Sequence, residues 1–275
     1  MPKVKVNDIQ MYYELHGQGD PFVCISGTGF NGQTWKPYQV PEFSSAYQVL
    51  IFDHRGTGES DKPDGPYSTR VFADDLAGLM DALGLSRAHV LGHSMGGRVA
   101  QHLALDYPDK VRTLILAGSG SGQYDRSRYM TRGIPVYTCL ELVEKGYERY
   151  MEDHIAGEFF FSPDFVREHP EVVQKVKASY SCSPTPLKNY LLHVIARQEH
   201  ETTDRLGEIK APTLVLVGGQ DRVVGGTGDH FRAAEVLAER IPNAEFVVVK
   251  GARHAFLWED PAQTHKLIWD FIKRF

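Results

Sequence analysis

The feature that most constrains the fold is the stretch 90–99, which contains the pattern Gly92-His93-Ser94-Met95-Gly96. An apolar run at 87–91 precedes it and is typical of a buried parallel strand, and apolar residues recur at helical spacing from 99 to 107. A G-x-S-x-G pattern between a strand and a helix predicts a sharp turn that holds Ser94 at the start of the helix. Free backbone N–H groups and the helix dipole favour negative charge there.

Strand and helix patterns alternate on both sides of this turn, which predicts an α/β fold built on a mostly parallel eight-stranded sheet with helices on both faces. A hairpin is expected at one edge, where 3–6 and 9–15 alternate around Asn7-Asp8. The other strands are expected at 21–26, 48–52, 87–91, 111–116, 212–217 and 245–249, and the helices at 68–83, 95–107, 229–240 and 261–275. Ser68 or Thr69 is a candidate cap for the first of these helices, and Gly84 follows its end.

The alternation breaks between about 124 and 205, where the chain is helical, rich in aromatic residues and without a clear strand pattern. We interpret this segment as a helical lid inserted over one end of the sheet. The predicted domains are therefore a core at 1–122 and 206–275 and a lid at 123–205.

Composition excludes several functional classes. The net charge is −5 without a basic block, so no nucleic-acid partner is expected. No apolar run reaches the roughly 20 residues of a membrane helix, and the N-terminus lacks a signal-peptide pattern. The three cysteines are few and far apart, which favours a reducing, cytoplasmic location. No metal or cofactor motif is present, so neither is expected. The oligomeric state stays open, with a homodimer as one candidate.

Five motifs together resemble the α/β-hydrolase superfamily across nearly the whole chain. They are Ser26-Gly27-Thr28-Gly29, the stretch from Phe52 to Ser60, Gly92-His93-Ser94-Met95-Gly96-Gly97, Gly219-Gln220-Asp221 and Gly251-Ala252-Arg253-His254-Ala255. Within the superfamily the chain is most similar to small lidded members: 3-oxoadipate enol-lactonase-like, aminoacrylate hydrolase-like and meta-cleavage hydrolase-like proteins. The resemblance implies the α/β-hydrolase fold.

The resemblance also implies a catalytic triad in the order serine, acid, histidine. A serine hydroxyl is a weak nucleophile and needs a base, which in turn needs an orienting acid. His254 is chosen among 12 histidines because it follows the last strand and its turn, just before the final helix. Asp221 is the preferred acid because it lies nearest the end of its strand. Asp229, beyond the glycine-rich loop 225–228, is a second candidate.

An oxyanion hole needs two donors directed at the developing charge. The superfamily pattern implies the backbone N–H groups of Met95 and Thr28. One departure is Ser26, where many relatives have a histidine, and it is expected to change how this loop is supported.

Weaker predictions concern the substrate pocket. Phe30, Trp35 and Phe256 are candidate substrate contacts, although Trp35 is equally well explained as core. Asp53 and Arg55 are interpreted as a structural pair. Arg126, Arg128 and Arg132 could receive a substrate carboxylate, but exposed helix charges explain them better. The histidines of the helix and lid segments, His102, His154, His169, His193, His200, His230 and His265, are interpreted as solvated or structural.

The predicted activity is hydrolysis of a small carboxylic ester or lactone through an acyl-enzyme. A meta-cleavage C–C hydrolase and an amide or carbamate hydrolase would use the same triad. A slow-turnover, receptor-like binding protein is an alternative of another class. Fold alone does not fix the acyl group, the leaving group or the bond that is cleaved.

Overall fold

The computed structural model describes residues 2–122, 134–156, 160–221 and 229–275. Its centre is one eight-stranded sheet in the order β1-β2-β4-β3-β5-β6-β7-β8. β1 and β2 form an antiparallel hairpin, β2 runs antiparallel to β4, and the remaining pairs are parallel. The strands are β1 (Lys3–Val6), β2 (Ile9–His16), β3 (Pro21–Ile25), β4 (Gln48–Phe52), β5 (Ala88–His93), β6 (Val111–Ala117), β7 (Thr213–Gly218) and β8 (Glu245–Val249).

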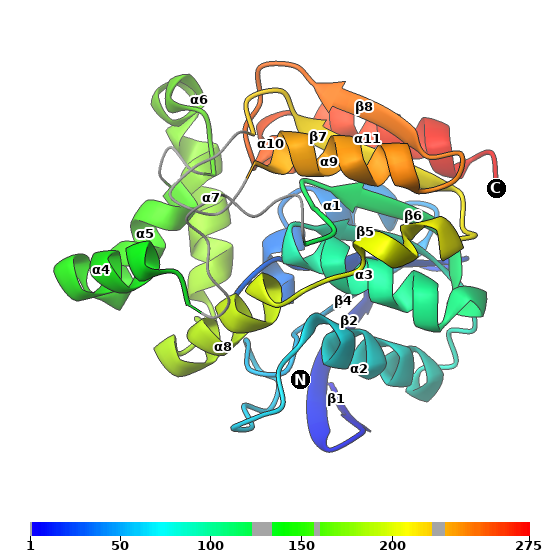
Figure 1. Ribbon diagram of the computed structural model, residues 1–275, viewed down its shortest axis with the longest axis horizontal. Helices are drawn as coiled ribbons and strands as arrows, with labels where there is room; N and C mark the ends of the chain where they lie inside the picture. Colours follow the sequence, from blue (N-terminus) through cyan, green and yellow to red (C-terminus); the bar gives the residue numbers. More distant parts are fainter. Residues whose placement is uncertain (1, 123–133, 157–159, 222–228) are drawn as a thin grey trace.

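Helices cover both faces of this sheet, as the alternating pattern predicts (Figure 1). One buried apolar cluster joins the sheet to α2 (Thr69–Ala82), α3 (Met95–Asp106) and α9 (His230–Arg240). A second cluster joins the opposite face to α1 (Gln39–Phe43) and α11 (Pro261–Ile272). The prediction of a mostly parallel eight-stranded sheet between helical layers is confirmed.

The segment between β6 and β7 carries the inserted helices α4 (Val136–Lys145), α5 (Tyr147–Ala156), α6 (Pro163–Glu168), α7 (Pro170–Ser181) and α8 (Leu187–Gln198). In Figure 1 they stand together at one end of the sheet. Aromatic residues of this segment, including Phe161 and Tyr190, belong to the same buried cluster as α1 and α11. The insertion therefore packs its core onto the body of the protein, and it forms one wall of the site described below.

Local chemistry explains the element boundaries. The Ser68 side chain caps α2 by accepting a hydrogen bond from Val71 N, and Gly84 just beyond the helix has a φ of 71°. The short elements α1, α10 (Phe256–Glu259) and the 3-10 turns Gly32–Trp35, Pro108–Lys110 and Thr203–Glu208 have too few residues to show a periodic pattern, and the sequence prediction missed them.

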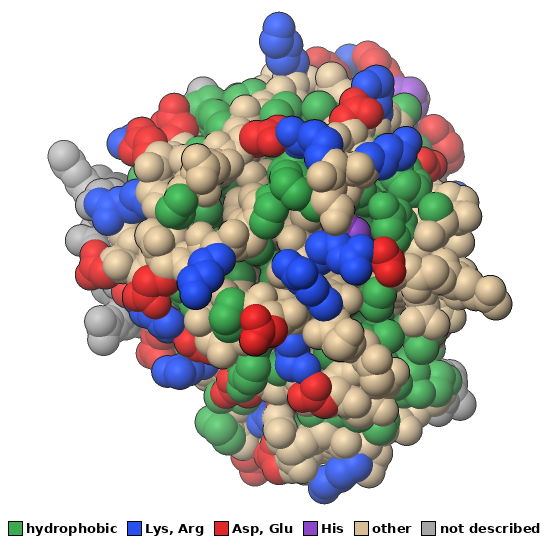
Figure 2. All heavy atoms as spheres, turned by 90° about the vertical axis from the view of Figure 1, so that its right-hand side faces the viewer, with side chains coloured by type: hydrophobic (Ala, Val, Ile, Leu, Met, Phe, Trp, Pro, Cys, Tyr) green, Lys and Arg blue, Asp and Glu red, His purple; other side chains and the backbone are tan. Residues whose placement is uncertain are grey.

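Two observations concern the surface. Within the described ranges, no helix combines the length and apolar composition that crossing a bilayer requires. Figure 2 shows the side facing away from the lid, where basic and acidic side chains are interspersed.

Candidate active site

Ser94 occupies a strained turn between β5 and α3. Its φ and ψ are 57° and −120°, outside the regions that side-chain-bearing residues normally adopt, and it is the N-cap residue of α3. The turn is possible because Gly92 and Gly96, two residues away on either side of Ser94, have no side chains. A Cβ on Gly96 would lie 2.1 Å from the carbonyl oxygen of Ile25, and a Cβ on Gly92 would lie 2.4 Å from that of Gly96. The half-buried Ser94 side chain is therefore held at the N-terminus of a 12-residue helix.

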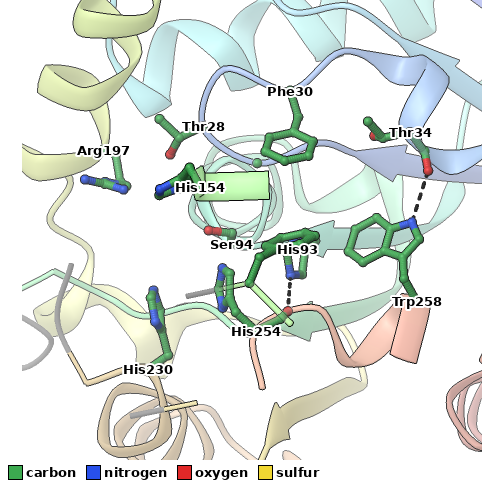
Figure 3. Close-up of a pocket in the computed structure, with 12 residues that line it drawn as sticks. Thr28, Phe30, Thr34, His93, Ser94, His154, Arg197, His230, His254 and Trp258 are labelled. Carbon is green, nitrogen blue, oxygen red and sulfur yellow. Dashed lines mark hydrogen bonds between the residues drawn. The ribbon is translucent and has the colours of Figure 1, made fainter. Parts of the chain in front are cut away.

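Asp221 and His254 come together from the loops that follow β7 and β8. His254 Nδ1 lies 2.7 Å from Asp221 Oδ2, and both side chains are buried. Backbone hydrogen bonds hold the acid in place: Asp221 N donates to Gly218 O, and Phe231 N at the start of α9 donates to Asp221 O. In Figure 3 the His254 ring lies next to Ser94.

The electrostatics of this pair define the tautomer of His254. Burial disfavours the charged carboxylate of Asp221, but the attraction of His254 and His230 outweighs burial and places its pKa below the usual value. The acid is thus ionised and accepts the hydrogen bond, so Nδ1 of His254 carries the proton. Burial lowers the pKa of His254, and Asp221 opposes that shift. At neutral pH, His254 is therefore an unprotonated base at Nε2.

His230, at the start of α9, is a third member of this cluster. The sequence pattern predicts only a solvated or structural role for this histidine. Its Nδ1 lies 3.2 Å from Asp221 Oδ1, and its ring centroid is 4.4 Å from that of His254. Asp221 therefore lies between two histidines. No local pattern distinguishes His230, because its contact with Asp221 depends on how α9 packs against the end of β7.

Asp221, His230 and His254 offer ligand atoms that all lie within 4.8 Å of one another, so a cation site deserves consideration. Ligand atoms on a tetrahedral zinc ion, each about 2.0–2.1 Å from the metal, would be roughly 3.3 Å apart. The 2.7 Å separation of His254 Nδ1 and Asp221 Oδ2 is instead that of a hydrogen bond. The geometry favours a shared proton over a metal ion.

A small pocket, partly open to solvent, lies over Ser94 and His254. Its walls come from the loop after β3, the loop that carries His254, the start of α9 and the lid (Figure 3). The lining residues are Gly27, Thr28, Phe30, Thr34, His93, Ser94, His154, Phe160, Arg197, His230, His254 and Trp258.

Two backbone N–H groups near Ser94 have no partner among the residues that the structure describes. In the part of the chain that the structure describes, neither Met95 N nor Thr28 N donates a hydrogen bond. Met95 is the first residue of α3, and Thr28 lines the pocket. A Cβ placed on Gly27 would lie 3.2 Å from Ser94 Cβ. The loop after β3 and the turn that holds Ser94 therefore meet at the serine.

The predicted substrate contacts separate into two groups. Phe30 lines the pocket, whereas Trp35 and Phe256 are fully buried and do not belong to the described lining residues. Trp35 Nε1 donates to Ser26 Oγ at 2.8 Å, and Ser26 Oγ donates to Asn31 O at 3.2 Å. Ser26 thus supports the loop through Trp35, and the position of Trp35 fits its interpretation as core. Trp258, which the sequence analysis did not select, lines the pocket instead.

The interpretation of Asp53 and Arg55 as structural residues is confirmed, although the two have different partners. Asp53 accepts hydrogen bonds from the backbone N–H groups of Gly32 and Glu59. Arg55 Nε instead lies 2.6 Å from Asp75 Oδ2, and its Nη2 lies 2.9 Å from Asp8 Oδ1. Both residues brace loops, but each does so with a partner that is distant in sequence and is brought close only by the fold.

The structure also shows the contacts of two further candidate residues, Asp229 and His93. Asp229 caps α9, where its Oδ1 accepts from Arg232 N at 3.1 Å, so it does not contact His254 in the manner of Asp221. His93 Nε2 lies 2.9 Å from the carbonyl oxygen of His254 and fixes that loop, although its ring also lines the pocket. Arg126, Arg128, Arg132 and the loop 225–228 lie outside the described residues.

Comparison with known proteins identifies the family. Residues 20–261 match the family described as the alpha/beta hydrolase fold. The chain belongs to the α/β-hydrolase fold family. It is accordingly an enzyme of the α/β-hydrolase type, as its sequence motifs predict.

Among similar proteins is "Putative carbamate hydrolase RutD" of Azorhizobium caulinodans, which is 29% identical over 271 residues and aligns over 98% of each chain. "3-oxoadipate enol-lactonase 2" of Acinetobacter baylyi is 28% identical and aligns over 98% of this chain and 95% of its own. Among solved structures, the enol-lactonase from Burkholderia xenovorans LB400 superposes with a TM-score of 0.83 at 25% identity, over 99% of this chain and 100% of its own.

Proposed function

We propose that the protein is a serine hydrolase that cleaves a small carboxylic ester or lactone through an acyl-enzyme. The observation that carries this proposal is the placement of Ser94, in a strained turn at a helix N-terminus, in one pocket with the His254–Asp221 pair. A nucleophile, a base and an orienting acid from three separate loops are the parts that acyl transfer requires.

The mechanism follows from the protonation states. His254 Nε2 accepts the proton of Ser94 Oγ while that oxygen attacks the substrate carbonyl carbon. Asp221, 2.7 Å from Nδ1, stabilises the imidazolium that forms. The backbone N–H groups of Met95 and Thr28, which donate no hydrogen bond among the described residues, hold the developing oxyanion. His254 then protonates the leaving oxygen, and water repeats the sequence on the acyl-enzyme to release the acid.

Ester or lactone cleavage is preferred because the pocket is small and partly apolar, with Phe30, Phe160 and Trp258 in its wall. Relatives named as enol-lactonases, one curated and one of known structure, resemble the chain over nearly its full length. A carbamate hydrolase is the second candidate. It rests on the equally complete match to RutD, whose name assigns that activity to it. A carbamate carbonyl would be attacked by the same three residues.

The decisive experiment combines active-site labelling with turnover. The protein is treated with a fluorophosphonate probe, and the modified residue is located by mass spectrometry. In parallel, hydrolysis is measured with 4-nitrophenyl acetate and butyrate, a lactone series, an alkyl carbamate and a meta-cleavage ring-fission product. Labelling of Ser94 with fast ester or lactone turnover is the expected result.

Ser94→Ala should abolish labelling and turnover while leaving the fold intact. Ser119→Ala is a matched control, because Ser119 is buried near the same turn and its hydroxyl has no hydrogen-bond partner among the described residues. If Ser94 is labelled and the protein cleaves the carbamate or the ring-fission product but neither esters nor lactones, a carbamate or C–C hydrolase activity would replace the proposed one. Activity that survives in Ser94→Ala would refute the mechanism.

A further inference from the structure

The lid contributes one buried cation to the pocket. Arg197 lies near the end of α8, its side chain is only 9% exposed, and it lines the wall over Ser94. An arginine side chain stays protonated at any physiological pH. Within the described ranges, no aspartate or glutamate lies within ion-pair distance of it. A charge that is buried without a partner is costly, so this arrangement calls for an explanation.

Arg55 shows how the same protein treats a buried arginine with a structural role. Arg55 is 2% exposed, and it meets the carboxylates of Asp75 and Asp8 at 2.6 and 2.9 Å. Its charge is neutralised by the fold itself. Arg197 is buried to a comparable degree. Where Arg55 meets two carboxylates, Arg197 lines a cavity. The counter-charge of Arg197 is therefore expected to come from a molecule that enters the cavity.

The guanidinium acts on the groups of the active site. Burial lowers the pKa of His154 to about 3, and the charge of Arg197 adds to the shift. The charge of Arg197 also contributes, after burial, to the lowered pKa of His254. Arg197, His154 and His254 all line the same pocket. In Figure 3, Arg197, His154 and Thr28 lie at one end of the pocket, and Trp258 and Thr34 lie at the other.

Two polar groups adjoin Arg197 in the pocket wall. Thr28 Oγ1 is buried and has no hydrogen-bond partner in the part of the chain that the structure describes. His154, on α5, is neutral at pH 7 and is held by the stacked ring of Tyr150, whose centroid is 5.6 Å away. The Thr28 hydroxyl can donate one hydrogen bond to an anion beside the planar fork of an arginine.

We propose that Arg197, with Thr28, binds a carboxylate of the substrate. The preferred substrates are then small esters or lactones that carry a free carboxylate in addition to the bond that is cleaved. This inference rests on the proposed function and narrows it to a class of anionic substrates. The planar guanidinium suits a carboxylate because two of its N–H groups can donate in parallel to the two oxygens.

The test compares matched neutral and anionic esters. Ethyl hexanoate is paired with monoethyl adipate, which places the carboxylate on the acyl side. Propyl butyrate is paired with 2-carboxyethyl butyrate, which places it on the alcohol side. Hydrolysis is followed in a pH-stat for the wild type, Arg197→Gln, Arg197→Lys and the control Arg112→Gln. Arg112 lies on β6, outside the pocket lining, and pairs with Asp20.

The expected result is a kcat/KM at least tenfold higher for the anionic member of one pair in the wild type. Arg197→Gln should remove that preference, Arg197→Lys should keep part of it, and Arg112→Gln should keep all of it. Equal rates within both pairs in the wild type would overturn the proposal. So would an Arg197→Gln variant that loses the same factor on neutral and anionic esters, since that would indicate a merely structural role.

Folding and the proposed function are checked separately. Circular dichroism and thermal unfolding establish whether Arg197→Gln is folded. If it is not, competitive inhibition of the wild type by adipate is compared with inhibition by hexanoate. Adipate should bind at least tenfold more tightly, and equal inhibition overturns the carboxylate site. Ser94 labelling and neutral-ester turnover report on the hydrolase mechanism: if both persist without an anion preference, only the carboxylate site fails, and if both are absent, the proposed function fails.

Discussion

Replacing Asp221 by asparagine tests the assignment of the acid. The change keeps the size and shape of the side chain but removes its charge. An asparagine amide can also donate a hydrogen bond to Nδ1 of His254, which would move the ring proton to Nε2. In that tautomer His254 cannot accept the proton of Ser94, so the variant should lose catalysis while remaining folded.

The size of the effect follows from the 2.7 Å contact between His254 Nδ1 and Asp221 Oδ2. The imidazolium formed in the transition state and the carboxylate have charge centres about 4 Å apart. Two unit charges at that separation attract by about 4 kcal/mol at an effective dielectric constant of about 20. At about 1.4 kcal/mol per factor of ten, kcat should fall about 10³-fold in Asp221→Asn.

The assay is kcat on the best ester or lactone, with Asp229→Asn as the matched control. Asp229 is the other acid that the sequence allows, and it caps α9 through Arg232 N. Asp229→Asn should keep its activity, because asparagine also caps helices well. The reasoning would be refuted if Asp221→Asn retained a tenth of wild-type kcat, or if Asp229→Asn lost as much activity.

Three further predictions follow. Burial lowers the pKa of His254, and the ring must be neutral to act as a base. The acidic limb of the kcat/KM profile should therefore have its midpoint below about pH 6.5, the usual pKa of histidine, and a midpoint above that pH would contradict this. His230 contributes to the same lowering, so His230→Gln should move the acidic limb of the pH–rate profile to higher pH, and an unchanged limb would count against the interaction. A Cβ on Gly96 would lie 2.1 Å from the backbone oxygen of Ile25, so Gly96→Ala should reduce the free energy of unfolding by about 3 kcal/mol. Gly84→Ala, with φ at 71° but open space around it, should lose about 1 kcal/mol in urea titrations, and equal losses would argue against the steric explanation.

Most of the fold could be predicted from the sequence because its signals are local. The apolar runs of the buried strands, the caps of α2 and the glycines around Ser94 each act within a few residues, and the strand–turn–helix context identifies the serine. His254 and Asp221 could be selected because each follows a strand of the same parallel sheet. The carboxyl ends of such strands meet at one edge, so order along the chain also specifies proximity.

The wall of the pocket could not be predicted in the same way. Arg197 and His154 look like ordinary helix residues, and only the packing of the lid onto the core brings them to the cavity over Ser94. His230 meets Asp221, and Arg55 meets Asp75, through contacts set by helix packing. Trp35 and Phe256 lie close in sequence to functional loops, yet their large apolar side chains are buried beneath the pocket wall.

The sequence by itself thus determined the sheet, the helical layers and the position of the nucleophile, because backbone propensity and hydrophobic periodicity act over short distances along the chain. The tertiary structure alone decided which charges and rings surround that nucleophile. Those contacts join residues that are far apart in sequence, and they depend on how side chains from the lid and the core fill one shared space.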